Sequence, residues 1–136
     1  MKNIFKIIPH FKLKWNYKSW RIEKWFEIEI INKLRAMGFR CFHPQDVWLW
    51  NKFLDLHIVS PIHKPRELAW IEFKYIKWDT FNIKALRDNQ IEDLKLLEDF
   101  AEVWIYSVKR NDYKRFYLKD LWRLKNDKWS IKIFNN

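Results

Sequence analysis

The sequence contains little glycine, proline or cysteine and no long apolar run. Its one glycine and four prolines leave no flexible linker, low-complexity tract or repeat, which predicts a single domain over residues 1–136. The only cysteine, Cys41, excludes an internal disulfide and a cysteine-ligated zinc or iron–sulfur site within one chain. Lysines interrupt the apolar residues of the N-terminus, so no signal peptide or membrane span is expected. A soluble, cytoplasmic protein that does not bind membranes is predicted.

The net charge of +10 is concentrated at the two ends of the chain. Residues 1–24 contain seven Lys or Arg and one acid, residues 109–136 contain nine and three, and the middle contains eleven and thirteen. Basic residues that neutralise phosphates supply most of the sequence-independent affinity for nucleic acids. The pattern therefore predicts a polyanion partner whose phosphates contact the basic flanks on either side of an acidic central site. The alternative is a generic basic surface.

Hydrophobic periodicity and turn residues predict an α/β fold. A helical pattern over 20–37 ends at Gly38, as expected where a C-terminal cap requires positive φ. The remaining elements, in chain order, are predicted as strands 39–43, 53–59 and 67–76, helix 82–101 and strand 102–109. Short strands at 115–118 and 128–134 with a helical turn at 120–124 are expected beyond them. The order αβββαβ predicts a mixed central sheet flanked by helices, with a core over about 20–110, a basic N-terminal segment 1–18 and a C-terminal extension 111–136.

Two predicted strands carry candidate catalytic residues. Side chains alternate across a strand, so Glu72 and Lys74 share one face, and Asp55 turns away from its apolar neighbours. If these strands pair, Asp55 and Glu72 can converge, and two carboxylates are a suitable ligand set for Mg²⁺. A lysine beside them can position a nucleophilic water or neutralise charge on a phosphate. The alternative is a solvated Glu-x-Lys pair on a half-exposed strand.

Two further polar residues lie in or beside apolar helical stripes. Glu27 follows Glu23 by one turn, and these like charges repel unless a lysine or a bound metal lies between them. Gln90 lies between Leu86 and Leu94, where a core helix normally has an apolar residue. Gln90 could donate a hydrogen bond to an active-site carboxylate, a water or DNA. The alternatives are an exposed acidic pair for Glu27 and a satisfied structural amide for Gln90.

Taken in chain order, Glu27, Asp55, Glu72, Lys74 and Gln90 resemble the motifs of the PD-(D/E)XK nuclease superfamily. Within it, the resemblance is strongest to the archaeal-type Holliday junction resolvases. The first helix is similar in its glutamate, Glu27, one helix-length before Gly38-Phe39. Residues 53–56 (Phe-Leu-Asp-Leu) resemble the family's metal-binding strand, and residues 71–74 (Ile-Glu-Phe-Lys) its Glu-x-Lys strand. Gln90 is similar to a glutamine that many relatives have after that strand. No proline precedes Asp55, which differs from the pattern in the superfamily's name.

The resemblance implies a restriction-endonuclease-like core and a metal-dependent DNA endonuclease that hydrolyses phosphodiester bonds, with branched DNA as substrate. Asp55, Glu72 and the backbone carbonyl of Phe73 would bind Mg²⁺, for which Mn²⁺ can substitute. Lys74 would act at the nucleophilic water, and Glu27 would assist the metal site. A homodimer would follow, because junction resolution needs two active sites. DNA repair, recombination, restriction and viral genome processing all use this chemistry.

Two other functions remain open from the sequence. A nuclease of the same superfamily could act on DNA ends or single strands. A non-catalytic protein could bind single-stranded nucleic acid by stacking bases on Trp15, Tyr17 and Trp20, which lie among lysines. Zinc is not expected, because the four histidines lack ligand spacing and Cys41 with His43 is typical of ordinary packing.

Overall fold

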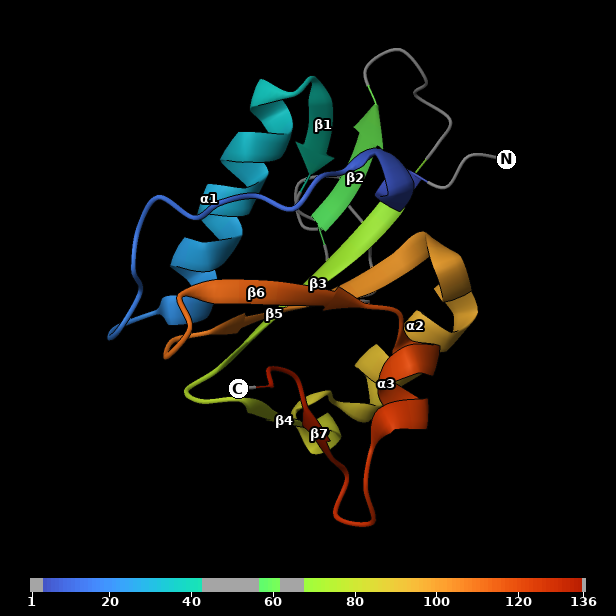
Figure 1. Ribbon diagram of the computed structural model, residues 1–136. Coiled ribbons are helices and arrows are strands. Elements are labelled where there is room, and N and C mark those ends of the chain that lie inside the picture. Colours follow the sequence, from blue (N-terminus) through green and yellow to red (C-terminus); the bar gives the residue numbers. More distant parts are fainter. Residues whose placement is uncertain (1–3, 43–56, 62–67, 136) are drawn as a thin grey trace.

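The computed structural model describes residues 4–42, 57–61 and 68–135 of the chain (Figure 1). Within these residues, five strands form one mixed sheet in the order β1-β2-β3-β5-β6, and β4 pairs with β7 in a separate two-stranded sheet. The elements are η1 (Ile4–Ile7), α1 (Ile22–Ala36), β1 (Phe39–Phe42), β2 (His57–Pro61), β3 (Ala69–Ile76), β4 (Thr80–Asn82), η3 (Ile83–Ala85), α2 (Asp88–Leu97), η4 (Glu98–Phe100), β5 (Ala101–Ser107), β6 (Asp112–Phe116), α3 (Leu118–Leu124) and β7 (Ser130–Lys132). The α/β class is confirmed. No helix among the described residues is long and apolar enough to cross a membrane.

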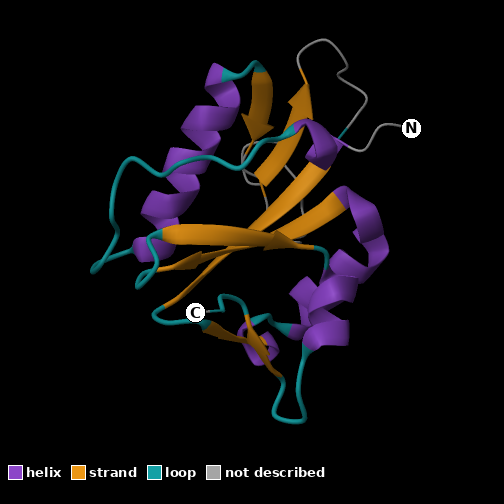
Figure 2. Ribbon diagram, in the orientation of Figure 1, coloured by secondary structure: helices purple, strands orange, loops and turns teal. Residues whose placement is uncertain are grey.

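The main sheet contains both antiparallel and parallel pairs. Strands β1, β2 and β3 form an antiparallel meander, β3 and β5 are parallel, and β6 returns antiparallel to β5. The parallel connection from β3 to β5 contains β4 and α2, as a crossover between parallel strands requires. Strand β3 is therefore central, with β2 on one side and β5 on the other (Figure 2).

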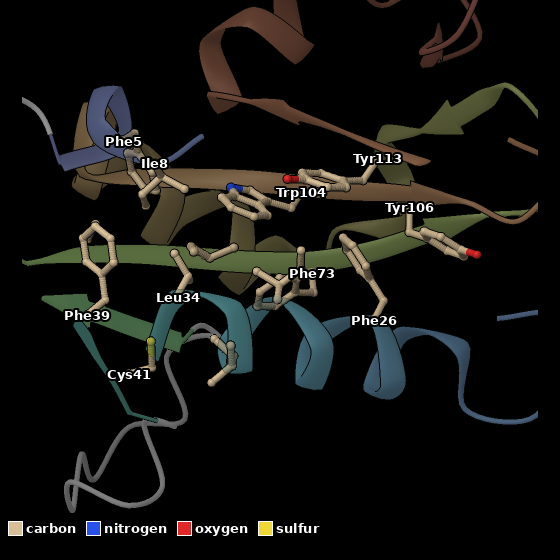
Figure 3. Close-up of a cluster of buried hydrophobic side chains, with 14 of the residues drawn as sticks. Phe5, Ile8, Phe26, Leu34, Phe39, Cys41, Phe73, Trp104, Tyr106 and Tyr113 are labelled. Carbon is tan, nitrogen blue, oxygen red and sulfur yellow. The ribbon is translucent and has the colours of Figure 1, made fainter. Parts of the chain in front are cut away.

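Each face of the sheet has its own apolar core. On one face, α1 and the N-terminal segment pack against β3, β5 and β6, and Figure 3 shows Phe26 and Leu34 pointing from α1 toward the sheet. On the other face, α2, α3 and the β4–β7 pair surround a second core. The alternation of β3 fits this division, because Ile71 and Phe73 belong to the first core and Ile76 to the second. The result is a sheet between two layers.

The first helix ends as predicted. The Gly38 backbone has φ +95°, which is costly for residues with a Cβ, and its N–H donates to the Arg35 carbonyl at 3.0 Å. Strand β1 follows at once. The single glycine of the chain is therefore used at a position that requires one.

The predicted helix over 82–101 is wrong in its bounds. The side chain of Asn82 accepts a hydrogen bond from the Lys84 N–H and starts a 3₁₀ turn, and Leu86 is extended. Helix α2 begins only at Asp88 and ends at Leu97, and the next residue, Glu98, is its C-cap with φ 47°. Ala101 then belongs to β5 rather than to the helix. The apolar spacing was continuous because Leu86 and Ala101 pack in the same core as the helix without being part of it.

The two ends of the chain also contribute to the cores. Four apolar residues of the N-terminal segment are buried beside α1, namely Ile4, Phe5, Ile8 and Leu13. Ile131, Ile133 and Phe134 are buried in the second core near the C-terminus. The helical turn expected at 120–124 is helix α3, and the two short strands expected around it are β6 and β7 with shifted bounds.

Candidate active site

A buried carboxylate lies on the central strand. Glu72 of β3 is opposite Val103 of β5, and only 1% of its surface is exposed. Its neighbours along the strand, Ile71 and Phe73, turn to the α1 face, so the Glu72 side chain lies on the α2 face. Removing an ionised carboxylate from water is costly unless other groups compensate for the charge. The solvated-pair interpretation of Glu72 is therefore wrong.

Lys74 supplies a cation beside this carboxylate. It lies two residues further along β3, and its Nζ atom is 3.7 Å from Glu72 Oε1. The Lys74 side chain is itself mostly buried, so solvent screens this pair less than it screens pairs at the surface. The prediction that Glu72 and Lys74 share one face of the strand is confirmed.

Gln90 connects helix α2 to the same carboxylate. Its Nε2 group donates a hydrogen bond of 3.1 Å to Glu72 Oε1, and only 1% of its surface is exposed. Its Oε1 atom accepts a hydrogen bond from the Arg87 backbone N–H at 3.0 Å, which satisfies a donor at the start of α2. Gln90 is therefore a satisfied structural amide, as one alternative held, and it also donates to the Glu72 carboxylate. That this carboxylate belongs to an active site stays a prediction. Through these two bonds the beginning of α2 fixes the orientation of the carboxylate.

Glu27 lies on the helix that covers the other face. It is buried, and Lys24 Nζ lies 3.9 Å from its Oε2 atom, so a lysine provides the cation that the acidic pair requires. A hollow of about 130 Å³ beside it is lined by Lys24, Glu27, Ile28, Ile31, Asn32 and Arg35. Glu72, Lys74 and Gln90 form one cluster on the α2 face, whereas Glu27 belongs to the α1 layer.

The other two predicted metal ligands are Asp55 and the backbone carbonyl of Phe73. Asp55 lies outside the described residues, and β2 begins two residues after it, with His57 opposite Ile71 of β3. Phe73 is buried in the α1-side core, where its ring contacts Phe26 and Trp104 at centroid distances of 5.5 and 6.0 Å. Its predicted role concerns only the backbone carbonyl and stays a prediction.

One acidic residue was missed in the sequence analysis. Asp93 lies one turn after Gln90 on α2 and is buried. Among the described residues its Oδ2 atom has no hydrogen-bond partner. Burial, followed by the nearby Glu92 charge, raises the pKa of the Asp93 carboxyl. The sequence did contain a signal for Asp93, because this acid directly precedes Leu94, a residue of the apolar stripe.

The cluster contains an oxygen ligand suitable for a hard cation, but its side chains are too few to coordinate a metal ion without further ligands. In the part of the chain that the structure describes, no group of three or more His, Cys, Asp or Glu side chains is arranged to hold a metal ion. Glu72 offers carboxylate oxygen, the ligand type that Mg²⁺ and Mn²⁺ prefer. A second carboxylate would have to come from a residue such as Asp55.

The cluster of Glu72, Lys74 and Gln90 combines a negative charge, a positive charge and an oriented amide in a largely apolar layer. Such a group can bind a cation, polarise a water or stabilise charge on a phosphate. Buried polar groups of this kind are expensive to fold and are typical of functional sites.

Comparisons of the chain with protein-family models, curated protein sequences and solved structures gave no match.

Proposed function

We propose that this protein is a metal-dependent DNA nuclease with a restriction-endonuclease-like core, and that Glu72, Lys74 and Gln90 form part of its active site. The observation that carries the proposal is the Glu72 carboxylate, which is 1% exposed and contacts Lys74 and Gln90 on the central strand. A purely structural strand at this position would be more stable with an apolar side chain.

The topology supports the proposal. Along the chain α1, β1, β2, β3, α2 and β5 come in this order, and β4, which lies between β3 and α2, belongs to the separate two-stranded sheet. Without β4 this is the αβββαβ order that the hydrophobic periodicity predicted, and it is compatible with the restriction-endonuclease-like core that we propose. The helices α1 and α2 cover opposite faces of the sheet.

Each residue of the cluster has a role in phosphodiester hydrolysis. Glu72 and Asp55 would hold Mg²⁺ or Mn²⁺ together with the Phe73 carbonyl, and the bound ion would supply an activated water and a counter-charge for the phosphate. Lys74 lies close enough to Glu72 for its ammonium to orient that water or to neutralise the scissile phosphate. Gln90 keeps the Glu72 carboxylate in one orientation.

The remaining parts of the proposal concern the substrate. A net charge of +10 favours a polyanion, because basic side chains gain affinity from phosphate contacts. The resemblance to Holliday junction resolvases favours branched DNA and a twofold dimer. The assisting role predicted for Glu27 is not part of this proposal, because Glu27 lies in the α1 layer, across the sheet from Glu72.

The test compares wild-type protein with Glu72→Gln, Lys74→Met and Asp55→Asn. Each would be incubated with labelled four-way-junction, flap, duplex and single-stranded DNA in Mg²⁺, in Mn²⁺ and in EDTA, and the products resolved on a denaturing gel. Wild-type protein should cut in either metal but not in EDTA. Each variant should lose roughly 100-fold or more in rate, because it removes an electrostatic or acid–base contribution to the transition state.

Asp127→Asn and Lys128→Met are matched controls, because they remove the same charges from exposed residues. Both should cut like the wild type, and circular dichroism should show that all variants are folded. The proposal fails if wild-type protein cuts none of these DNAs in either metal. It also fails if Glu72→Gln and Lys74→Met cut as fast as the two controls.

A further inference from the structure

A groove of about 810 Å³ separates the N-terminal segment from the outer side of α1. In Figure 1 this segment, in blue, crosses over the helix before the chain turns back into α1. Aromatic side chains form one wall and α1 forms the other, and the apolar lining includes Trp15, Tyr17, Trp20, Trp25, Ile28 and Ala36. None of the residues of the candidate active site lines this groove.

The wall of the groove is fixed by a single buried carboxylate. Glu29 of α1 accepts hydrogen bonds from the backbone N–H of Lys14 at 2.6 Å and of Trp15 at 3.3 Å, and from the Tyr17 hydroxyl at 2.5 Å. The Tyr17 backbone N–H also donates to the Tyr106 hydroxyl at 3.1 Å. Burial, together with the Glu29 charge, raises the pKa of Tyr17, so its hydroxyl stays a donor at neutral pH. The groove is therefore preorganised by specific contacts.

Its tryptophans are unusually exposed. Trp15 is 60% exposed and Trp20 is 73% exposed, and Trp25 presents part of its ring to the same groove. Cations lie near two of these rings, with Lys14 Nζ 5.4 Å from the Trp15 centroid and the Arg21 guanidinium 5.4 Å from the Trp20 centroid. Large aromatic side chains are usually buried, and an exposed cluster of them is typical of a binding surface.

The charge of the groove selects among possible occupants. Lys14, Lys18 and Lys33 line it against one acid, Glu29, which accepts hydrogen bonds from the backbone and Tyr17 and lies 3.8 Å from Lys33 Nζ. Lys14 and Lys18 therefore supply the positive charge that Glu29 does not offset. A ligand with both flat aromatic groups and negative charge would match this lining. Single-stranded nucleic acid has both, because unpaired bases can stack on indole rings while the phosphates contact lysines. In a duplex the base faces are already stacked within the helix.

We infer that this groove binds an unpaired stretch of DNA, with bases stacked on Trp15 and Trp20 and phosphates at Lys14 and Lys18. The identification of DNA rests on the proposed function, which the inference deepens by naming the substrate class. The groove and the hollow beside Glu27 share Ile28 and Asn32 in their linings, so a strand in the groove passes close to that acid. Among branched DNAs, the nuclease would then act on those with a single-stranded portion, such as a flap, rather than on a fully paired four-way junction.

The test measures binding without cleavage. Fluorescence anisotropy of a labelled oligothymidylate of about 15 nucleotides would be recorded in EDTA, with a duplex of the same length as competitor. Wild-type protein should prefer the single strand. Trp15→Ala and Trp20→Ala should each weaken binding roughly ten-fold, since each removes one stacking platform. Trp78→Ala, which removes a tryptophan that is 67% exposed and does not line the groove, should bind like the wild type.

A second arm tests the phosphate contacts. Lys18→Gln should reduce the slope of the affinity with salt concentration by about one, whereas the exposed Lys128→Gln should not. The inference is overturned if Trp15→Ala and Trp20→Ala bind the single strand as tightly as Trp78→Ala does. It is also overturned if duplex DNA competes as well as single-stranded DNA. It is also overturned if sedimentation shows that these variants abolish a dimer while single-strand affinity is kept, because the groove would then bind a second copy.

Failure of the groove and failure of the nuclease proposal are distinguishable. If wild-type protein binds single strands through the groove but cuts nothing in Mg²⁺ or Mn²⁺, only the nuclease proposal fails. If Glu72→Gln abolishes cleavage while Trp15→Ala and Trp20→Ala leave single-strand binding unchanged, only the inference about the groove fails.

Discussion

Arg115 on β6 fastens the N-terminal segment to the sheet, and its removal should be strongly destabilising. Its guanidinium donates to the carbonyls of Phe5 and Ile8, each at 2.7 Å, and to Glu102 Oε1 at 2.7 Å. It also lies over the ring of Trp104, at 4.8 Å from the centroid. A second bond to Glu102, from Arg115 Nη2 to Oε2, is 3.4 Å long. Arg115→Ala therefore removes four charge-assisted hydrogen bonds and leaves the buried Glu102 carboxylate without its cation.

The magnitude follows from that buried charge. Breaking a buried ion pair from one side typically costs about 3–5 kcal/mol, so we expect Arg115→Ala to lower the free energy of unfolding by about that amount. A domain of this size is stabilised by roughly 5–15 kcal/mol, so the loss is a large fraction of the total. The control is Arg123→Ala, whose exposed guanidinium is 3.5 Å from Asp120. That substitution should change the free energy of unfolding by less than about 1 kcal/mol.

The effect should also depend on pH. Burial raises the pKa of the Glu102 carboxyl, and the hydrogen bonds from Arg115 and Trp104 oppose that increase. Without Arg115 the folded-state pKa rises further above the unfolded value, so the proton is held more tightly in the folded state. The variant therefore loses stability as the pH rises through the folded pKa and regains it toward acidic pH. The difference from wild type should shrink as the pH is lowered toward the unfolded-state pKa of a glutamate, about 4.3.

Urea denaturation followed by near-ultraviolet circular dichroism at several pH values measures both effects. Adding Glu102→Gln to Arg115→Ala should recover part of the loss at neutral pH, because the uncompensated charge is removed. A loss no greater than that of Arg123→Ala would refute the reasoning. A large loss that is the same at all pH values would refute the part assigned to Glu102.

Two further substitutions test local features of the fold. Gly38→Ala should lower the free energy of unfolding by about 1–2 kcal/mol in thermal denaturation. No atom lies within 4 Å of the added Cβ, so the cost comes from the backbone φ of +95° alone. Gly38→Asn should cost less, because asparagine tolerates positive φ better than alanine does. Gln90→Leu should cost about 1–2 kcal/mol in urea denaturation, because it leaves Glu72 and the Arg87 N–H without the amide. No loss on Gly38→Ala, or a stabilised Gln90→Leu variant, would contradict these expectations.

Local sequence signals were sufficient for the elements whose boundaries are set locally. Helix α1 has regular apolar spacing, and its end coincides with the only glycine in the chain. The second helix was predicted too long because periodicity reports which residues are buried and not which backbone conformation buries them. Leu86 in an extended segment and Leu94 in α2 fill the same core. The 3₁₀ turn before Leu86 begins with a hydrogen bond to the Asn82 side chain, and apolar periodicity carries no information about such a bond.

The N-terminal segment shows where long-range contacts decide the structure. Its isolated apolar residues lie among lysines and show no regular period, so the sequence predicted only a basic flank. They are buried because Arg115 binds the carbonyls of Phe5 and Ile8 and because the Tyr113 hydroxyl accepts the Phe11 N–H at 2.6 Å. These partners are more than 100 positions away in the chain, which places them beyond any local pattern.

In the candidate site, too, local sequence patterns predicted some residues correctly and misplaced another. Strand alternation was enough to put Glu72 and Lys74 on one face. An amide in an apolar stripe identified Gln90 as a candidate, but it left open whether the partner was a carboxylate, a water, DNA or only the backbone. Sequence could not assign Glu27 to the opposite layer, because the face that a helix covers depends on the path of the whole chain. The association of Glu27 with the cluster was an inference from order along the chain alone.

The candidate active site and the groove lie in different layers of the molecule. Glu72, Lys74 and Gln90 lie on the α2 face of the sheet, whereas the groove lies against the outer side of α1. A strand held by Trp15 therefore contacts none of the three cluster residues from within the groove. Substitutions in the groove should then act on affinity and those in the cluster on the rate of hydrolysis, with little coupling between them. Such independence is what a nuclease needs if it recognises an unpaired strand at one place and hydrolyses a phosphodiester at another.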